Sequence, residues 1–398
     1  MRRLGLVILL AITVVLVSVA VASRSDSSDR GATRSHAGGS TSHRTSRTSS
    51  ATTSATTTTT TMPIPNSDGT LALLRTVTGD ISPKSVVASG RGYVFAQNMM
   101  YKHSITVYDR NGDLAKTIPD AVDLSAFGIG GHAGEVRGAP VEVAFSPDGT
   151  KAYVSNYSMY GAGFGPEGSD NCRAGDGTDT SFVYRVDIAT LAIDAVIPVG
   201  AVPKYVAASP DGRLLVVTNW CSFDASIIDL ATNTEVKRIP LGPYPRGIVI
   251  TPDSRTAYVA VMGTANIARI DLVGFGLSWI YNVGAGPRHL VLSPDGLTLY
   301  ATLNGEGRVA KLDPVNGVVQ AKVSTGQAPR SMAISTDGKH LYVVNYDSGT
   351  MSALDATTMA KVQDVRTGFH PIGITYDRAT GNIWVANYTG SIMIFGSG

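Results

Sequence analysis

One motif recurs at a fixed spacing through the second half of the chain. Each copy opens with a glycine three residues before a proline, and most copies continue through a Pro-Asp turn into an apolar run. Its prolines are 42 residues apart, at Pro203, Pro245, Pro287, Pro329 and Pro371. A constant period of this length indicates a repeat protein, in which units that cannot bury their apolar faces alone stack on one another.

Each repeat contains four short runs that alternate apolar and polar residues and are rich in Val, Ile, Tyr and Ala. Such runs, separated by turn residues, predict β-strands. In the repeat that opens at Pro287 we expect strands at 288–293, 297–302, 308–313 and 318–323. The tripeptide Pro294-Asp295-Gly296 predicts a tight turn between the first two, because proline fixes φ and glycine permits the left-handed position.

Two earlier copies, opening at Pro83 and Pro140, bring the series to seven. The last copy has three strands, with the third at 391–395, and the segment 71–77 has the character of the missing fourth. We therefore predict an all-β, seven-bladed β-propeller of four-stranded antiparallel blades over residues 67–398. Its N-terminal strand completes the last blade, and this closure protects strand edges from aggregation.

The repeat resembles that of the YVTN-repeat β-propeller family, which occurs in exported and surface-layer proteins. The resemblance rests on SPDGTKAYVSN at 146–156 and on Tyr-Val-x-Asn at 153–156 and 342–345, with tryptophan for tyrosine at 384–387. It covers residues 71–395 and implies that the first strand of each blade is innermost and begins at one face, called the top face below. It supplies no catalytic residue at a numbered position here.

The N-terminal 66 residues differ in composition from the repeats. Arg2 and Arg3 precede an uncharged run at 4–22, which is typical of a signal peptide (1–22) but is also long enough for an uncleaved membrane anchor. Residues 23–66 are rich in Ser and Thr, and we expect a disordered stalk. Either alternative predicts an extracytoplasmic protein, secreted or anchored to the outer side of the cytoplasmic membrane.

The spacing between the first three prolines is longer than 42, at 57 and 63 residues. The surplus lies mainly at 119–139 and 158–180, which we place on the top face. Loops on a rigid scaffold commonly carry function, so the insertions suggest a working face. The alternative is that these loops vary without functional consequence.

A cation follows the opening proline in five of the seven blades. Gathered around a channel, such charges would attract anions. The alternative is a packing role, in which each cation bridges to a carbonyl or carboxylate of the next blade. Asn156 and Asn219, at the ends of second strands, are weaker ligand-binding candidates, with hydrogen bonding inside turns as their alternative. The candidate cations are Lys84, Lys204, Arg246, Arg288 and Arg330.

The chain has two cysteines, Cys172 in the second insertion and Cys221 after the second strand of the third blade. Exported proteins meet an oxidising environment, so we predict a Cys172–Cys221 disulfide that ties the insertion to the neighbouring blade. Top-face histidines (His103, His132 and His370) lack metal-ligand spacing, as do the acidic residues of the second insertion. We expect no metal and no cofactor.

The formal net charge of +2 argues against nucleic acid as a partner. We expect an exported, monomeric binding or scaffold protein of the cell envelope that is not an enzyme and holds a protein partner or an anionic ligand on its top face. Contact with a membrane would be confined to residues 4–22, if uncleaved. Because seven-bladed propellers include lactonases, the resemblance leaves open a hydrolase of lactonase type that acts on an anionic sugar lactone.

Overall fold

A computed structural model describes residues 70–99, 101–131, 134–158, 172–173 and 175–396, all within the unit Thr61–Gly398. The predicted signal segment and stalk lie outside the described residues. Within the described ranges, no helix has the length and apolar character needed to cross a membrane.

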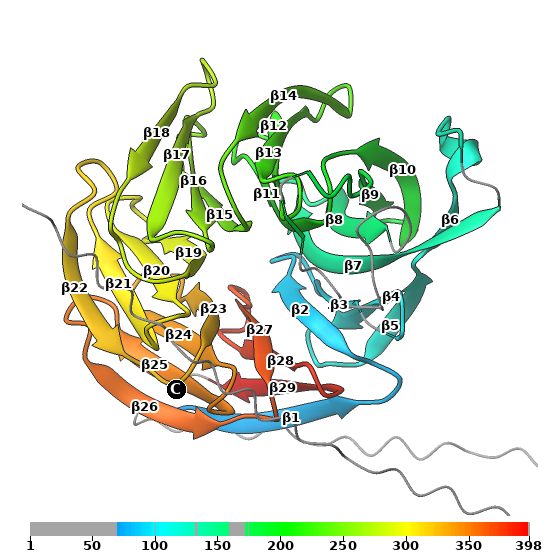
Figure 1. The fold of residues 1–398 in the computed structure, drawn as a ribbon. Coiled ribbons are helices and arrows are strands. Elements are labelled where there is room, and N and C mark those ends of the chain that lie inside the picture. Colours follow the sequence, from blue (N-terminus) through cyan, green and yellow to red (C-terminus); the bar gives the residue numbers. More distant parts are fainter. Residues whose placement is uncertain (1–69, 100, 132–133, 159–171, 174, 397–398) are drawn as a thin grey trace, which may run out of the picture. The chain divides into compact units, whose positions relative to one another are not determined.

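The described strands form seven antiparallel sheets, each of them one blade (Figure 1). Blade one contains β2 (Pro83–Ala88), β3 (Tyr93–Asn98), β4 (Ser104–Asp109) and β5 (Leu114–Pro119). Blade two contains β7 (Glu135–Phe145), β8 (Lys151–Ser158), β9 (Phe182–Asp187) and β10 (Ala192–Pro198). Blade three contains β11 (Pro203–Ala208), β12 (Leu214–Asn219), β13 (Asp224–Asp229) and β14 (Thr234–Pro240).

Blade four contains β15 (Pro245–Ile250), β16 (Thr256–Val261), β17 (Asn266–Asp271) and β18 (Leu277–Ile280). Blade five contains β19 (Pro287–Leu292), β20 (Leu299–Leu303), β21 (Arg308–Leu312) and β22 (Val319–Ser324). Blade six contains β23 (Pro329–Ile334), β24 (His340–Asn345), β25 (Thr350–Asp355) and β26 (Lys361–Arg366). Blade seven contains β27 (Pro371–Tyr376), β28 (Ile383–Asn387), β29 (Ser391–Gly396) and β1 (Ala72–Thr78).

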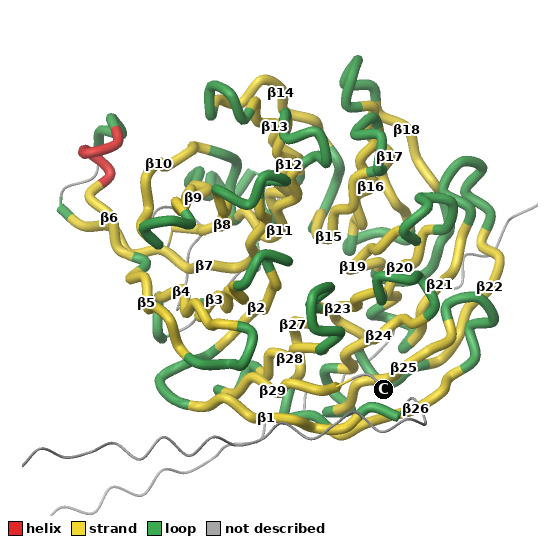
Figure 2. The backbone as a smooth tube through the Cα atoms, turned by 180° about the vertical axis from the view of Figure 1, so that it is seen from behind, coloured by secondary structure: helices red, strands yellow, loops and turns green. Residues whose placement is uncertain are grey.

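The ring closes through β1, as predicted. This strand pairs antiparallel with β29, with Ala72 opposite Gly396 and Thr78 opposite Ser391. The innermost strands contact one another in the cyclic order β2, β7, β11, β15, β19, β23, β27 and back to β2. Both backbone views show them around the centre (Figures 1 and 2). The prediction of a seven-bladed propeller is confirmed.

The repeat at Pro287 shows how the strands follow from the sequence. Its four strands agree with the predicted ranges within two residues, and β20 begins later than predicted because the turn is longer. The amide of Gly296 donates to the Ser293 carbonyl (2.8 Å), and the amide of Ser293 donates to the Thr298 carbonyl (2.9 Å). Gly296 has φ +74°, the conformation for which glycine is suited.

The apolar core lies between neighbouring blades. Blades three and four share one cluster that includes Val216, Ile227, Val259 and Ile270. Because side chains alternate across each strand, one face of a blade packs on the preceding blade and the other face packs on the next.

The first insertion adds a strand to blade two. The short β6 (Ala121–Asp123) pairs with the start of β7, and the 3-10 helix η1 (Leu124–Phe127) follows it. Leu124 is fully buried and packs with Phe182 and Tyr184 of β9. The insertion therefore packs against blade two through the apolar side chains of this short segment.

Candidate functional site

A β-bulge follows the opening proline in every blade. In blade three, Pro203 lies opposite Asn219 and Tyr205 opposite Thr218, so Lys204 is the additional residue. The other six inner pairs shift register at the same place. A bulge redirects the side chains around it, so it affects two successive positions of each inner strand, the extra residue and the one that follows it.

The first of these two positions carries the five cations, which we call the cation ring (Lys84, Lys204, Arg246, Arg288 and Arg330). Lys204, Arg246 and Arg288 are only 1%, 8% and 2% exposed. The pKa of Lys84 is lowered well below its ordinary value, first by burial and then by repulsion from the other four cations. Charges from five separate blades therefore act on one another across the ring.

Arg288 makes the packing contact considered above as the alternative to ligand binding. The guanidinium of Arg288 donates to the carbonyl of Arg330 in the next blade. Burial lowers the pKa of Arg288, as does repulsion from Arg246 and Arg330, while Glu142 partly offsets this effect. A structural role is thus present for Arg288, but this contact leaves the like charges facing one another.

Aromatic rings lie against three members of the cation ring. Cation–π attraction of this kind contributes about 0.5–2 kcal/mol, more when the pair is shielded from water. These contacts hold the cations in place within the ring. The pairs are Lys84 with Tyr388 (5.1 Å from Nζ to the ring centre), Lys204 with Trp220 (5.7 Å) and Arg330 with Tyr346 (4.1 Å from Cζ).

A cavity of about 600 Å³ lies inside the inner strands. The second bulge position forms the part of its lining next to the cation ring. We call its five side chains the polar layer: Ser85, Glu142, Tyr205, His289 and Ser331. The remaining blades have Gly247 and Gly373 at this position, where no side chain narrows the cavity.

Two members of the polar layer are joined by a hydrogen bond that spans blade four. The hydroxyl of Tyr205 lies 2.9 Å from Nε2 of His289, and the Met332 amide donates to Nδ1 of the same ring at 3.4 Å. Because Nδ1 accepts, the imidazole proton is on Nε2 and is donated to the Tyr205 oxygen. Burial, with repulsion from the arginines, lowers the pKa of His289 to about 3, so the ring is neutral at physiological pH.

Glu142 is the carboxyl group of the polar layer. Burial raises its pKa to about 7, an effect that Arg246 opposes first and the Ser85 hydroxyl next. The group therefore changes charge near neutral pH. Its position follows Val141, the blade-two residue that interrupts the series of cations.

Asn156 and Asn219 lie away from the cavity lining and form hydrogen bonds with nearby strands and loops. The Ala139 amide donates to Oδ1 of Asn156 at 2.8 Å, and Asn156 Nδ2 donates to the buried Asp120. Asn219 Nδ2 donates to Asp224 at 2.7 Å. These are the contacts of turn-bonding groups, the alternative given above.

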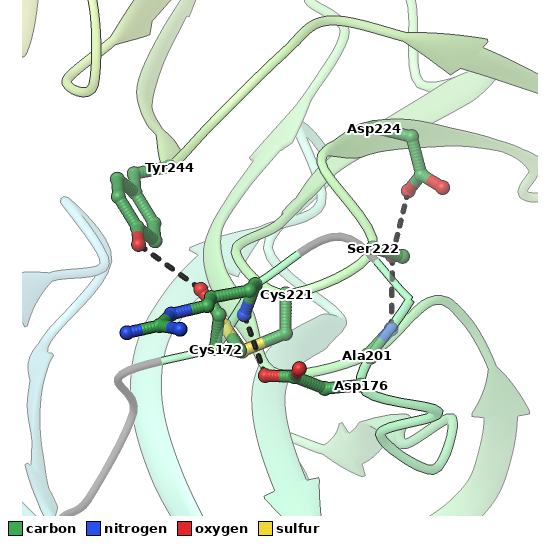
Figure 3. The surroundings of a disulfide bond; sticks show 8 residues. Cys172, Asp176, Ala201, Cys221, Ser222, Asp224 and Tyr244 are labelled. Atoms are coloured by element: carbon green, nitrogen blue, oxygen red, sulfur yellow. Dashed lines mark hydrogen bonds between the residues drawn. A yellow bond between two sulfur atoms is a disulfide. The ribbon is translucent and has the colours of Figure 1, made fainter. Parts of the chain in front are cut away.

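The predicted disulfide between Cys172 and Cys221 is confirmed, with their Cα atoms 5.5 Å apart. Figure 3 shows Tyr244 reaching this bridge from blade four, and its hydroxyl donates to the Cys172 carbonyl at 3.0 Å. The two cysteines pack with Val141, which occupies the cation position of blade two. The second insertion is thereby fixed at residue 172 next to the cation ring.

The top-face histidines do not form a common site in the part of the chain that the structure describes. Nδ1 of His103 lies 2.6 Å from the Gly138 carbonyl, and His370 stacks on Tyr346 with ring centres 4.1 Å apart. His132 lies outside the described residues. Across the described ranges, no group of three or more His, Cys, Asp or Glu residues is arranged to hold a metal ion.

Comparisons with known proteins define the family but no ligand. No curated protein matches the sequence. Among solved structures, hydrazine synthase of Kuenenia stuttgartiensis is similar, with 20% identity, a TM-score of 0.63, and coverage of 80% of this chain and 96% of that one. At this identity the likeness shows the fold alone. The model of the YNCE-like beta-propeller family matches residues 194–395, just over half of the chain, and the chain belongs to this family.

Proposed function

We propose that the protein is an extracytoplasmic binding protein that holds a small anionic ligand where the cation ring meets the central cavity. The carrying observation is the convergence of five cations: burial lowers the pKa of Lys84, and repulsion from the other four cations lowers it further. Buried charge is costly unless opposite charge compensates it. A bound anion would relieve this repulsion.

The proposed location rests on two features. The run at 4–22 has the composition of an export signal or anchor, and residues 23–66 would act as a spacer. The Cys172–Cys221 disulfide fits an oxidising compartment. The ligand would then be a component of the cell envelope or a solute outside the cytoplasm.

Titration calorimetry with inorganic phosphate tests the proposal. Arg288→Gln should weaken phosphate binding at least tenfold, because it removes a buried charge from the ring. Arg213→Gln is the matched control, since it removes the same charge from a side chain that is 77% exposed, lies 3.9 Å from Asp211 and is not a member of the cation ring. The proposal fails if folded wild-type protein binds no phosphate, sulfate or citrate, or if both variants change binding equally.

One observation favours the second candidate, hydrolysis of an anionic sugar lactone. Glu142, with its pKa of about 7, lines the cavity beside cations that could stabilise a developing oxyanion. Its carboxylate would take a proton from water as the water oxygen bonds to the lactone carbonyl. The ring ester bond would then break, and the leaving ring oxygen would take that proton back from Glu142 to become a hydroxyl group. Acid release from a phosphorylated sugar lactone, abolished by Glu142→Gln, would support this candidate over simple binding.

A further inference from the structure

The cavity changes character along its length. Next to the cation ring it is lined by the polar layer, whereas the following part includes apolar side chains such as Val143, Val249 and Val291. Polar side chains therefore line the part into which a ligand bound to the cations would extend, and beyond the apolar part the lining also includes Arg91, Thr375 and Arg378. This distribution carries information about the part of the ligand that is not charged.

The polar layer contains hydrogen-bond acceptors as well as donors. The Ser331 hydroxyl donates to the Ile372 carbonyl at 2.8 Å, which leaves the oxygen lone pairs of Ser331 as acceptors. Ionised Glu142 is also an acceptor. Acceptors repel a bare anion but bind the hydroxyl hydrogens of a ligand, so their place beside the cations selects for a molecule that combines a negative charge with hydroxyl groups.

Tyr205 supplies the complementary donor. Its oxygen accepts the Nε2 proton of His289, so its own hydroxyl proton is directed away from the imidazole. The Met332 amide fixes the His289 tautomer that makes this possible. His289 is therefore a positioning residue, and Tyr205 is the group that would donate to the ligand.

The size of the cavity agrees with an extended ligand. At about 600 Å³ it is within the range of sites for small organic molecules, and an inorganic ion would occupy a small part of it. We infer that the ligand is a polyhydroxylated anion, such as a sugar acid or a sugar phosphate. Its charge lies against Arg246 and Arg288, and its hydroxyl groups lie against Tyr205, Glu142 and Ser331. This inference rests on the proposed function.

Three probes separate charge from hydroxyl recognition: gluconate, hexanoate of similar length and charge without hydroxyls, and uncharged sorbitol. Wild-type protein should bind gluconate at least tenfold more tightly than hexanoate and should bind sorbitol far more weakly than gluconate. Tyr205→Phe should weaken gluconate binding about three- to tenfold, the effect of one lost hydrogen bond, and should leave hexanoate binding unchanged. Ser331→Ala provides a second variant with the same expected selectivity.

The readout is the ratio of the gluconate and hexanoate affinities, which a general loss of folded protein does not alter. Equal affinities in the wild type, or equal losses for both anions in Tyr205→Phe, would overturn the inference. If phosphate binds and neither organic anion does, the inference fails and the proposed function stands. If no anion binds, the proposed function fails as well.

Discussion

Gly247 lies close against the inner strand of blade five, and adding one methyl group there tests how tightly the ring is packed. A Cβ at this position would lie 2.7 Å from the Arg288 carbonyl oxygen and 2.8 Å from Cα of His289. Both are main-chain atoms of β19, so no side-chain rotation can relieve the contact. Overpacking of this kind costs about 1–3 kcal/mol, and we expect Gly247→Ala to lose that much stability.

Gly276 of the same blade is the matched control. A Cβ there meets no heavy atom within 4 Å, and Gly276→Ala should gain about 0.4–1 kcal/mol by restricting the unfolded chain. The two variants should thus differ by about 1.5–4 kcal/mol in the free energy of unfolding.

Urea unfolding followed by tryptophan fluorescence measures this difference. Gly373→Ala repeats the test in blade seven, where the new Cβ would lie 2.7 Å from Cα of Ser85. If Gly247→Ala and Gly276→Ala unfold within about 0.5 kcal/mol of each other, the spread expected for neutral surface changes, the inner strands are not packed as closely as the distances imply.

Three further predictions concern the disulfide and two buried charged groups. Changing both Cys172 and Cys221 to alanine should lower the free energy of unfolding by about 4 kcal/mol, because the disulfide closes a loop whose ends are 49 residues apart. Reductant should lower the urea midpoint of the wild type and leave that of the double variant unchanged, and a wild type unaffected by reductant would contradict this prediction. Burial raises the pKa of Asp120 to about 7, so its folded form binds more protons than its unfolded form, and stability should fall as pH rises from about 4 through 7. Asp120→Asn should reduce that slope, and identical pH profiles would refute the assignment. Because burial and four cations lower the pKa of Lys84, Lys84→Met should raise the urea midpoint at pH 6 while weakening phosphate binding; a lower midpoint would show that the lysine stabilises the ring.

The fold could be predicted because it is repetitive. Each blade repeats the same strands and turns. The segment before Pro83 was predicted to supply the strand that the last repeat lacks, and the pairing of β1 with β29 confirms this prediction. The Cys172–Cys221 bridge followed from topology and from the count of cysteines. The pairing of β6 with β7 was missed, because an insertion has no second copy in the sequence with which to compare it.

The cations were found because they recur after five of the seven opening prolines, whereas the polar layer was missed because its residues do not recur. The position after the cation is occupied by Ser, Glu, Tyr, Gly, His, Ser and Gly around the ring. Because the residue type does not repeat, a search for periodic residues does not detect this position. If side chains simply alternated along the strand, the side chain at this position would also point away from that of the cation before it. Both positions lie at the bulge, and a register shift of this kind has no residue signature of its own.

The strand pairing that closes the ring has a mechanical consequence. Ala72 of β1 and Gly396 of β29 are at the same end of an antiparallel ladder. A force that pulls these two ends apart acts along the hydrogen bonds and opens them one after another, as a zipper opens, instead of loading them together in shear. The closure of the ring is therefore weak against tension applied between Ala72 and Gly396.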